Sequence, residues 1–154
     1  MARRQAAFLL VALLTAGALA GGVFARTGGT GSAAPTPAEY VGRVNAICGA
    51  YGKKLDAIPP PDTASPGSVY TLIGLALPVL REEEAKVRAL RAPIVLRPRL
   101  YRFFQLTDRS LAYLERARAQ AGKRELAGMM LALSAFERTR SRAKLVAISI
   151  GFRC

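Results

Sequence analysis

The most reactive nucleophiles that this sequence offers are the thiols of two cysteines, Cys48 in "NAICGAY" and Cys154 in "SIGFRC". A cysteine thiolate is a nucleophile and a metal ligand, whereas two thiols in an oxidising compartment form a disulfide. The 154-residue chain has no histidine, which excludes Ser-His-Asp and Cys-His arrangements and the commonest transition-metal ligand. We therefore predict a Cys48–Cys154 disulfide and no metal or cofactor site; a buried free Cys48 and an idle Cys154 are the alternative.

Acidic side chains are the remaining candidates for acid and base chemistry. They cluster once, in "EEE" at 82–84. Glu83 and Glu84 interrupt the apolar stripe of one expected helix, and Arg140 and Lys144 interrupt the stripe of another at a similar height. The pattern allows two interpretations, a polar layer buried inside the fold or two separate solvated patches. A buried layer would fix the register of the helices, because leaving one charged partner unpaired is costly.

Basic residues are concentrated in the second half of the chain, where sixteen bases and four acids lie between positions 86 and 154 of a protein with net charge +13. Arg102, Arg109, Arg116 and Lys123 recur every seven residues. That spacing drifts by only about 20° per step round a helix, so these residues are expected to form an exposed ridge. Such a ridge attracts anions, for example lipid headgroups or wall polymers. A solvated face without a partner is the alternative.

The elements that must position these residues follow an apolar N-terminus. Residues 1–25 contain two arginines, an apolar run from 6 to 25 and small residues at cleavage points, which is the pattern of an export signal. The run is also long enough to associate with and span a bilayer, so the segment could be cleaved or could remain as a transmembrane anchor. Residues 26–36, rich in Gly, Ser and Thr, are expected to be a flexible spacer. The domain at 37–154 is therefore expected to be extracytoplasmic, either secreted or anchored to the membrane.

Residues 37–154 show the pattern of four amphipathic helices and no strand. "TPAE" at 36–39 forms a capping box for the first helix, and "IPPPDTASPGS" must end it because proline cannot donate a hydrogen bond. The later helices are expected at about 65–90, 97–121 and 123–149, with Gly122 and Gly151 as stops. Short connections favour an all-α fold, an antiparallel four-helix bundle. The apolar face expected for the last helix comprises Leu126, Met129, Met130, Leu133, Phe136, Leu145 and Ile148.

The two cysteines constrain the register of this bundle. If all helices stood flush, Cys48 would lie roughly 27 Å from the end of the last helix, at 1.5 Å per residue. A disulfide needs Cα atoms within about 7 Å. We therefore expect the first helix to be displaced along the bundle, and the proline stretch to return the chain to the second helix.

The chain has a capped first helix that contains "AIC", a break at "RALRAP", and a C-terminal sequence of Gly, an apolar residue, any residue and Cys. In these features it resembles small exported helical proteins of high-GC bacteria. The resemblance covers residues 36–154. It implies the fold and the extracytoplasmic location, and it implies no activity.

These observations favour a noncatalytic envelope module, not an enzyme, that binds an envelope protein or an anionic surface. Two alternatives stay open. The first is a small ligand-binding protein or enzyme that uses the polar layer. The second, disfavoured by the export signal, is a nucleic-acid-binding protein in which Tyr101, Phe103 and Phe104 would stack on bases instead of packing in the core.

Overall fold

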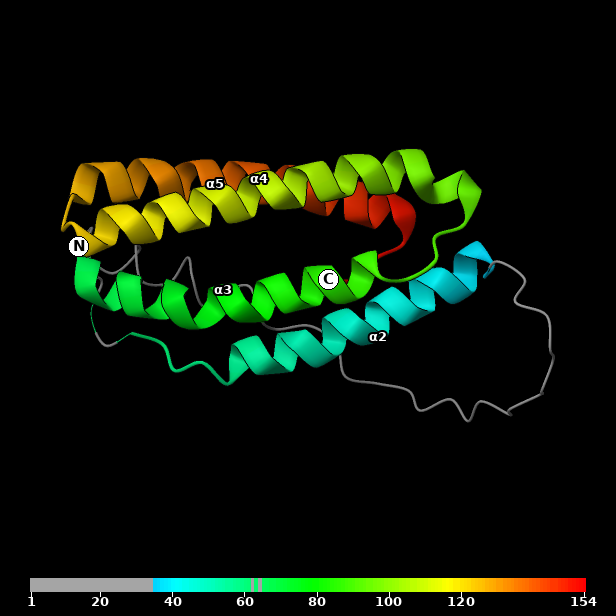
Figure 1. Cartoon of the computed structure of the whole chain (residues 1–154), viewed down its shortest axis with the longest axis horizontal. Helices are drawn as coiled ribbons and strands as arrows, with labels where there is room; N and C mark the ends of the chain where they lie inside the picture. Colours follow the sequence, from blue (N-terminus) through cyan, green and yellow to red (C-terminus); the bar gives the residue numbers. More distant parts are fainter. Residues whose placement is uncertain (1–34, 62, 64) are drawn as a thin grey trace, which may run out of the picture.

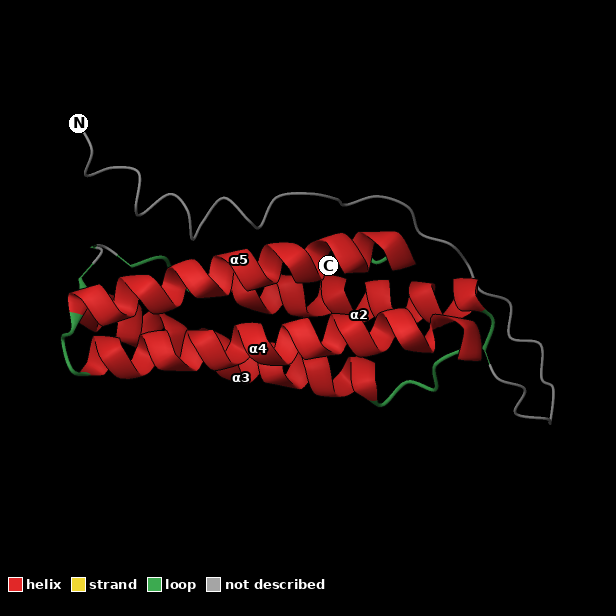
Figure 2. Cartoon of the chain, turned by 90° about the horizontal axis from the view of Figure 1, so that it is seen from above, coloured by secondary structure: helices red, strands yellow, loops and turns green. Residues whose placement is uncertain are grey.

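The computed structural model describes residues 35–154 except 62 and 64, and this part of the chain contains four long helices and no strand (Figure 1). The helices are α2 (Pro37–Asp56), α3 (Pro66–Arg88), α4 (Arg97–Gly122) and α5 (Leu126–Ile150), and a single 3-10 turn, η2 (Ile94–Leu96), precedes α4. Consecutive helices run in opposite directions, so the predicted antiparallel four-helix bundle is confirmed (Figures 1 and 2).

The predicted signal or anchor segment, 1–25, lies outside the described residues, as does the spacer up to residue 34. No helix of the described part has the length and apolarity needed to cross a membrane.

The starts of α2 and α3 follow directly from their capping residues. Thr36 Oγ1 accepts a hydrogen bond from Glu39 N at 3.2 Å, and the Glu39 carboxylate accepts one from Thr36 N at 2.8 Å. This reciprocal capping box satisfies two backbone donors that the helix itself leaves unpaired. Ser65 caps α3 in the same sense by accepting from Ser68 N at 3.2 Å.

The turn between α4 and α5 differs from the prediction. Gly122 is the last residue of α4 and does not adopt a left-handed conformation; Arg124 does, with φ of 59°. Residues 123–125 therefore form the turn, and α5 begins at Leu126 instead of Lys123. A Cβ at position 122 would meet the Tyr70 ring at 3.2 Å, so the glycine allows α3 to approach α4 closely at this end.

The apolar core has two parts along the bundle. One cluster joins α3, α4 and α5; its buried residues are Val69, Ile73, Leu77, Leu111, Leu114, Ala117, Ala121, Met129, Ala132 and Phe136. The second joins all four helices and the C-terminal segment; its buried residues are Tyr40, Val44, Cys48, Val87, Leu96, Leu100, Ala147, Ile150 and Phe152. On α3 the break between the two clusters falls between Leu77 and Val87, which places Glu83 and Glu84 at the boundary.

The buried face of α5 was only partly predicted. Met129 and Phe136 are buried, but Leu126, Met130, Leu145 and Ile148 are exposed. Small residues take their place in the interface, namely Ala132, Thr139, Ala143 and Ala147. Ala132 shares the first apolar cluster with Ala117 and Ala121 of α4, whereas Ala147 belongs to the second cluster. Small side chains along this face let the two helix backbones approach closely. The hydrophobic pattern alone misassigned this face because the larger apolar residues point outward.

The first helix is displaced along the bundle, as the cysteine spacing predicted. In Figure 1, α2 begins beyond the end of α3 and stops before reaching the end of the bundle at which α3 starts. This position brings Cys48 to Cys154, with S–S 2.02 Å and Cα–Cα 5.1 Å. The predicted disulfide is therefore present.

The C-terminal segment reaches Cys48 by a turn at Gly151. Gly151 has φ of 99°, a conformation that favours glycine, and Phe152 N donates to Ala147 O at 2.9 Å. The turn directs Phe152 back into the core, where the centroid of its ring lies 5.5 Å from the ring centroid of Phe103. Asn45 on α2 holds the segment from the other side, because its Oδ1 accepts from Arg153 N at 2.8 Å.

Removal of the disulfide should destabilise the fold strongly. In Cys154→Ser the Asn45 contact is the main polar link that remains between α2 and the C-terminal segment. Loss of a disulfide that closes so long a loop lowers the free energy of unfolding by about 2 to 5 kcal/mol. Denaturant unfolding of oxidised wild type and variant measures the loss. Cys48→Ser should lose the same amount, and the double variant no more than either single one. Additive losses would contradict a shared covalent role.

Candidate functional site

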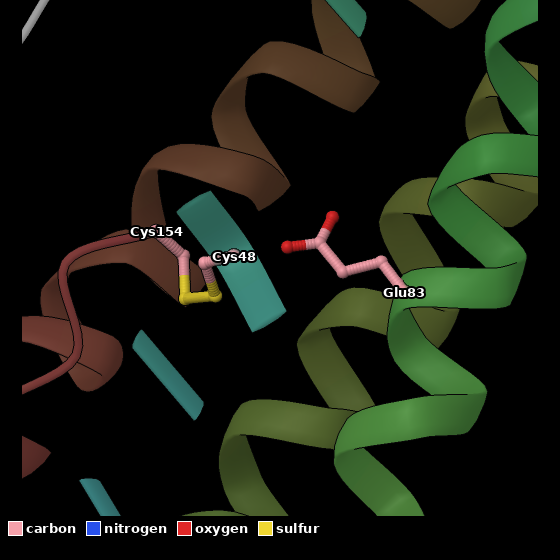
Figure 3. Close-up of side chains that lie close together, drawn as sticks. All are labelled: Cys48, Glu83 and Cys154. Carbon is pink, nitrogen blue, oxygen red and sulfur yellow. A yellow bond between two sulfur atoms is a disulfide. The ribbon is translucent and has the colours of Figure 1, made fainter. Parts of the chain in front are cut away.

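Glu83 is the most unusual ionisable residue of the described chain. It lies on α3 at the boundary of the two apolar clusters, and its carboxyl group points toward the disulfide (Figure 3). One of its oxygens, Cys48 Sγ and Cys154 Sγ all lie within 4.8 Å of one another. Three elements, α2, α3 and the C-terminal segment, therefore converge on one small polar site.

The environment of Glu83 disfavours its charge. Burial raises the pKa of Glu83 from 4.5 to about 7, and the positive charge of Arg140 on α5 opposes that rise. Arg140 does not form an ion pair with Glu83, so the field of the Arg140 charge acts on the carboxyl over a longer distance. Desolvation outweighs this attraction, and the carboxyl is about half protonated near neutral pH.

Glu84, the next residue, has a different partner. Its carboxylate accepts from Arg88 at 2.6 Å, and Arg88 also donates to Asp108 on α4 at 2.7 Å. Burial raises the pKa of Glu84, and the hydrogen bond with Arg88 opposes that effect. Arg81 on α3 pairs with Glu115 on α4. Relative to the Arg88–Asp108 pair, Arg81 lies seven residues earlier on α3 and Glu115 lies seven residues later on α4. The two pairs share one antiparallel register and align α3 with α4.

The four residues suggested for a buried polar layer thus separate into three groups. The charge of Arg140 acts on Glu83 without forming an ion pair with it, and Glu84 belongs to the α3–α4 ion pairs. Lys144 is exposed and does not belong to the layer. The buried row of α5 at that height passes through Ala143 and Ala147, and Lys144 lies about 100° round the helix from it.

Sequence reasoning missed the link between this layer and the disulfide. Both features were expected separately, but only the displaced register of α2 places Cys48 opposite Glu83. In the disulfide state neither sulfur is a thiolate, so the three groups do not form a set of metal ligands. The arrangement offers a proton donor and acceptor beside an S–S bond.

The predicted basic ridge is exposed along α4. Arg102, Arg109, Arg116 and Lys123 all face solvent. Within residues 35–154, apart from 62 and 64, none of the four takes part in a salt bridge. Their charges are therefore available to an external anion.

A groove of about 390 Å³ lies between the first half of α4 and the second half of α5. Arg102, Arg109 and Arg142 line it together with Gln105, and its apolar lining consists of Leu106, Leu145 and Val146. Arg142 comes from α5, so the heptad spacing on α4 could not identify it. The groove combines three guanidinium groups with apolar side chains in one concave surface.

Exposed apolar residues lie in the lining of the groove and elsewhere on the same two helices. Leu145 is 68% exposed and Ile148 is 58% exposed on α5. Tyr101 on α4 is 68% exposed, so the expectation that it packs in the core is wrong, whereas Phe103 and Phe104 are half-buried beside the second core cluster. Tyr101 lies outside the core because the buried row at the start of α4 passes through Leu100.

No protein-family model, curated protein or solved structure matches the chain.

The pKa of Glu83 makes stability depend on pH. Because the folded state holds this proton more tightly than the unfolded chain, the stabilisation is complete below about pH 4.5 and is lost as the pH rises through about 7. The loss attributable to Glu83 is at most about 3 kcal/mol. Glu83→Gln should therefore match wild type near pH 4.5 and exceed it in stability at about pH 8, as measured by denaturant unfolding.

The comparison isolates Glu83, since the other carboxylates titrate alike in both proteins. A stability difference between wild type and Glu83→Gln that does not change over this pH range would contradict the assignment.

Proposed function

We propose that this protein is a noncatalytic, extracytoplasmic helical module that binds anionic lipid surfaces through α4 and α5. The observation that carries the proposal is the groove with Arg102, Arg109 and Arg142 around an apolar lining. Guanidinium groups bind phosphate in a bidentate manner, so three of them in one groove suit phospholipid headgroups.

The apolar part of the surface favours lipid over a wall polymer. A phosphate polymer would contact only the arginines, whereas a membrane also accepts apolar side chains below the headgroups. Leu145 and Ile148 are exposed beside the arginines and would lose contact with water on binding. Export, suggested by residues 1–25, would place the groove and the membrane in the same compartment.

The charge distribution supports the same face. The excess of bases lies between 86 and 154, whereas five of the ten acids lie on α2 and α3, at 39, 56 and 82–84. The electrostatic field of the protein is therefore asymmetric, and attraction to an anionic surface would turn α4 toward it.

Vesicle binding of the full chain tests this function. We expect stronger binding to vesicles that contain phosphatidylglycerol than to phosphatidylcholine alone, and weakening as salt rises toward about 0.3 M. Binding to the neutral vesicles reports any contribution of the apolar N-terminal segment. Arg102→Gln, Arg109→Gln and Arg142→Gln together should reduce the phosphatidylglycerol-dependent affinity by about 100-fold, since each basic residue contributes about 1 kcal/mol near such a surface.

A matched variant controls for net charge. Arg43→Gln, Lys53→Gln and Lys86→Gln together remove the same charge from exposed positions on α2 and α3. This variant should stay within about threefold of wild type, because its charges lie away from the groove. Equal losses in the two triple variants would reduce the proposal to a net-charge effect.

A second measurement separates lipid from polymer. Leu145→Ser should weaken binding to phosphatidylglycerol vesicles and leave binding to soluble polyphosphate unchanged. If it leaves both unchanged, the apolar lining has no role and a phosphate polymer becomes the better partner.

A further inference from the structure

The disulfide and the Glu83 carboxyl form a site that the proposed lipid surface does not use. The carboxyl faces both sulfurs within 4.8 Å (Figure 3). Among residues 35–154 without 62 and 64, no side chain or backbone group forms a hydrogen bond with it. The residue is half-buried and its oxygens are not among the fully buried polar atoms, so the carboxyl can exchange protons with solvent.

The two sulfurs differ in their surroundings. Cys48 is 6% exposed and lies in the second apolar cluster, whereas Cys154 is exposed. An external thiolate therefore reaches Cys154, and Cys48 becomes the leaving group. A thiolate released among apolar side chains is poorly solvated, and a leaving thiol with a raised pKa departs slowly. A nearby acid that protonates it would remove this barrier.

Few other charged groups act at this position. Arg140 on α5 is the charged side chain that influences Glu83. Glu84 on the same helix and Asp108 on α4 both pair with Arg88. Cys48 on α2 and Cys154 in the C-terminal segment do not titrate while they are bonded to each other. Glu83 is therefore the group placed to exchange a proton with Cys48.

We propose that the Cys48–Cys154 disulfide is a reversible redox site for an external dithiol, and that the Glu83 carboxyl donates and accepts the proton of Cys48. One thiolate of the dithiol attacks Cys154 Sγ, forms a mixed disulfide with it and displaces Cys48, which takes the proton of Glu83. The second thiol of the dithiol, deprotonated by solvent, then attacks the dithiol sulfur of the mixed disulfide and releases Cys154 as a thiolate, which takes a proton from solvent. The dithiol loses two electrons and becomes a disulfide, while Cys48 and Cys154 are reduced to thiols.

Oxidation reverses these steps. The Glu83 carboxylate takes the proton of the Cys48 thiol, and the resulting thiolate attacks Cys154 Sγ in the mixed disulfide. A carboxyl that is about half protonated near neutral pH can serve both directions, because both of its forms are populated.

The test compares the rates at which dithiothreitol reduces the oxidised full-length wild type and Glu83→Gln, followed by alkylation of the new thiols. Because both proteins are compared at the same pH, the ratio of their rates does not depend on how far dithiothreitol is ionised at that pH. We expect wild type to react at least about tenfold faster at about pH 6, where Glu83 is protonated, since general acids typically contribute more than this. The ratio should fall to within about twofold at about pH 8.5, with a transition near the pKa of Glu83.

Glu84→Gln is the matched control, because it removes the neighbouring carboxylate on the same helix without facing the disulfide. It should keep the wild-type pH profile. A wild-type to Glu83→Gln ratio that stays constant with pH, whatever its size, assigns Glu83 a structural role and overturns the proposal. The proposal is also overturned if Glu84→Gln reproduces the Glu83→Gln profile, since loss of charge on α3 would then explain the effect.

Discussion

The bond between Cys48 and Cys154 determines the register on which the rest of the arrangement depends. The other neighbouring helices are aligned by local means, since a turn of three residues joins α4 to α5 and the Arg81–Glu115 and Arg88–Asp108 pairs align α3 with α4. The connection from α2 to α3 is longer, and α2 presents mainly an apolar stripe to its neighbours, which sets its direction better than its position along the axis. The disulfide supplies that position covalently, and the Asn45 contacts with the C-terminal segment and the exposed Lys54–Glu82 ion pair between α2 and α3 reinforce it.

Much of this fold could be predicted from the sequence, because its signals are local. The capping box at Thr36, the proline stretch after α2 and the glycine at 151 specify helix ends through the hydrogen-bonding limits of individual residues. The displacement of α2 also followed from two numbers, the helical rise per residue and the reach of a disulfide. These inferences needed no knowledge of which side chains face each other.

The features that were missed depend on packing between helices. Alanine is nearly neutral in a hydrophobic pattern, so the row through Ala143 and Ala147 was hidden by the larger Leu145 and Ile148 nearby. Arg142 entered the candidate groove only once α4 and α5 were placed side by side. Counting residues from the helix starts brought Glu84, with Glu83 beside it, to the level of Arg140. Counting could not show that Glu84 would turn to Arg88 or that Glu83 would face a disulfide.

The long separation of the two cysteines also gives the molecule an unusual covalent topology. Residues 48 to 154 form a closed ring that contains α3, α4, α5 and the end of α2, whereas the chain before Cys48 is a tail attached to that ring. A protease that cuts one peptide bond inside the ring, for example beside the prolines at 59–61, opens the ring into two chains that the disulfide still joins, and releases no fragment. Such a nick leaves the mass of the oxidised protein almost unchanged and becomes visible as two fragments only after reduction.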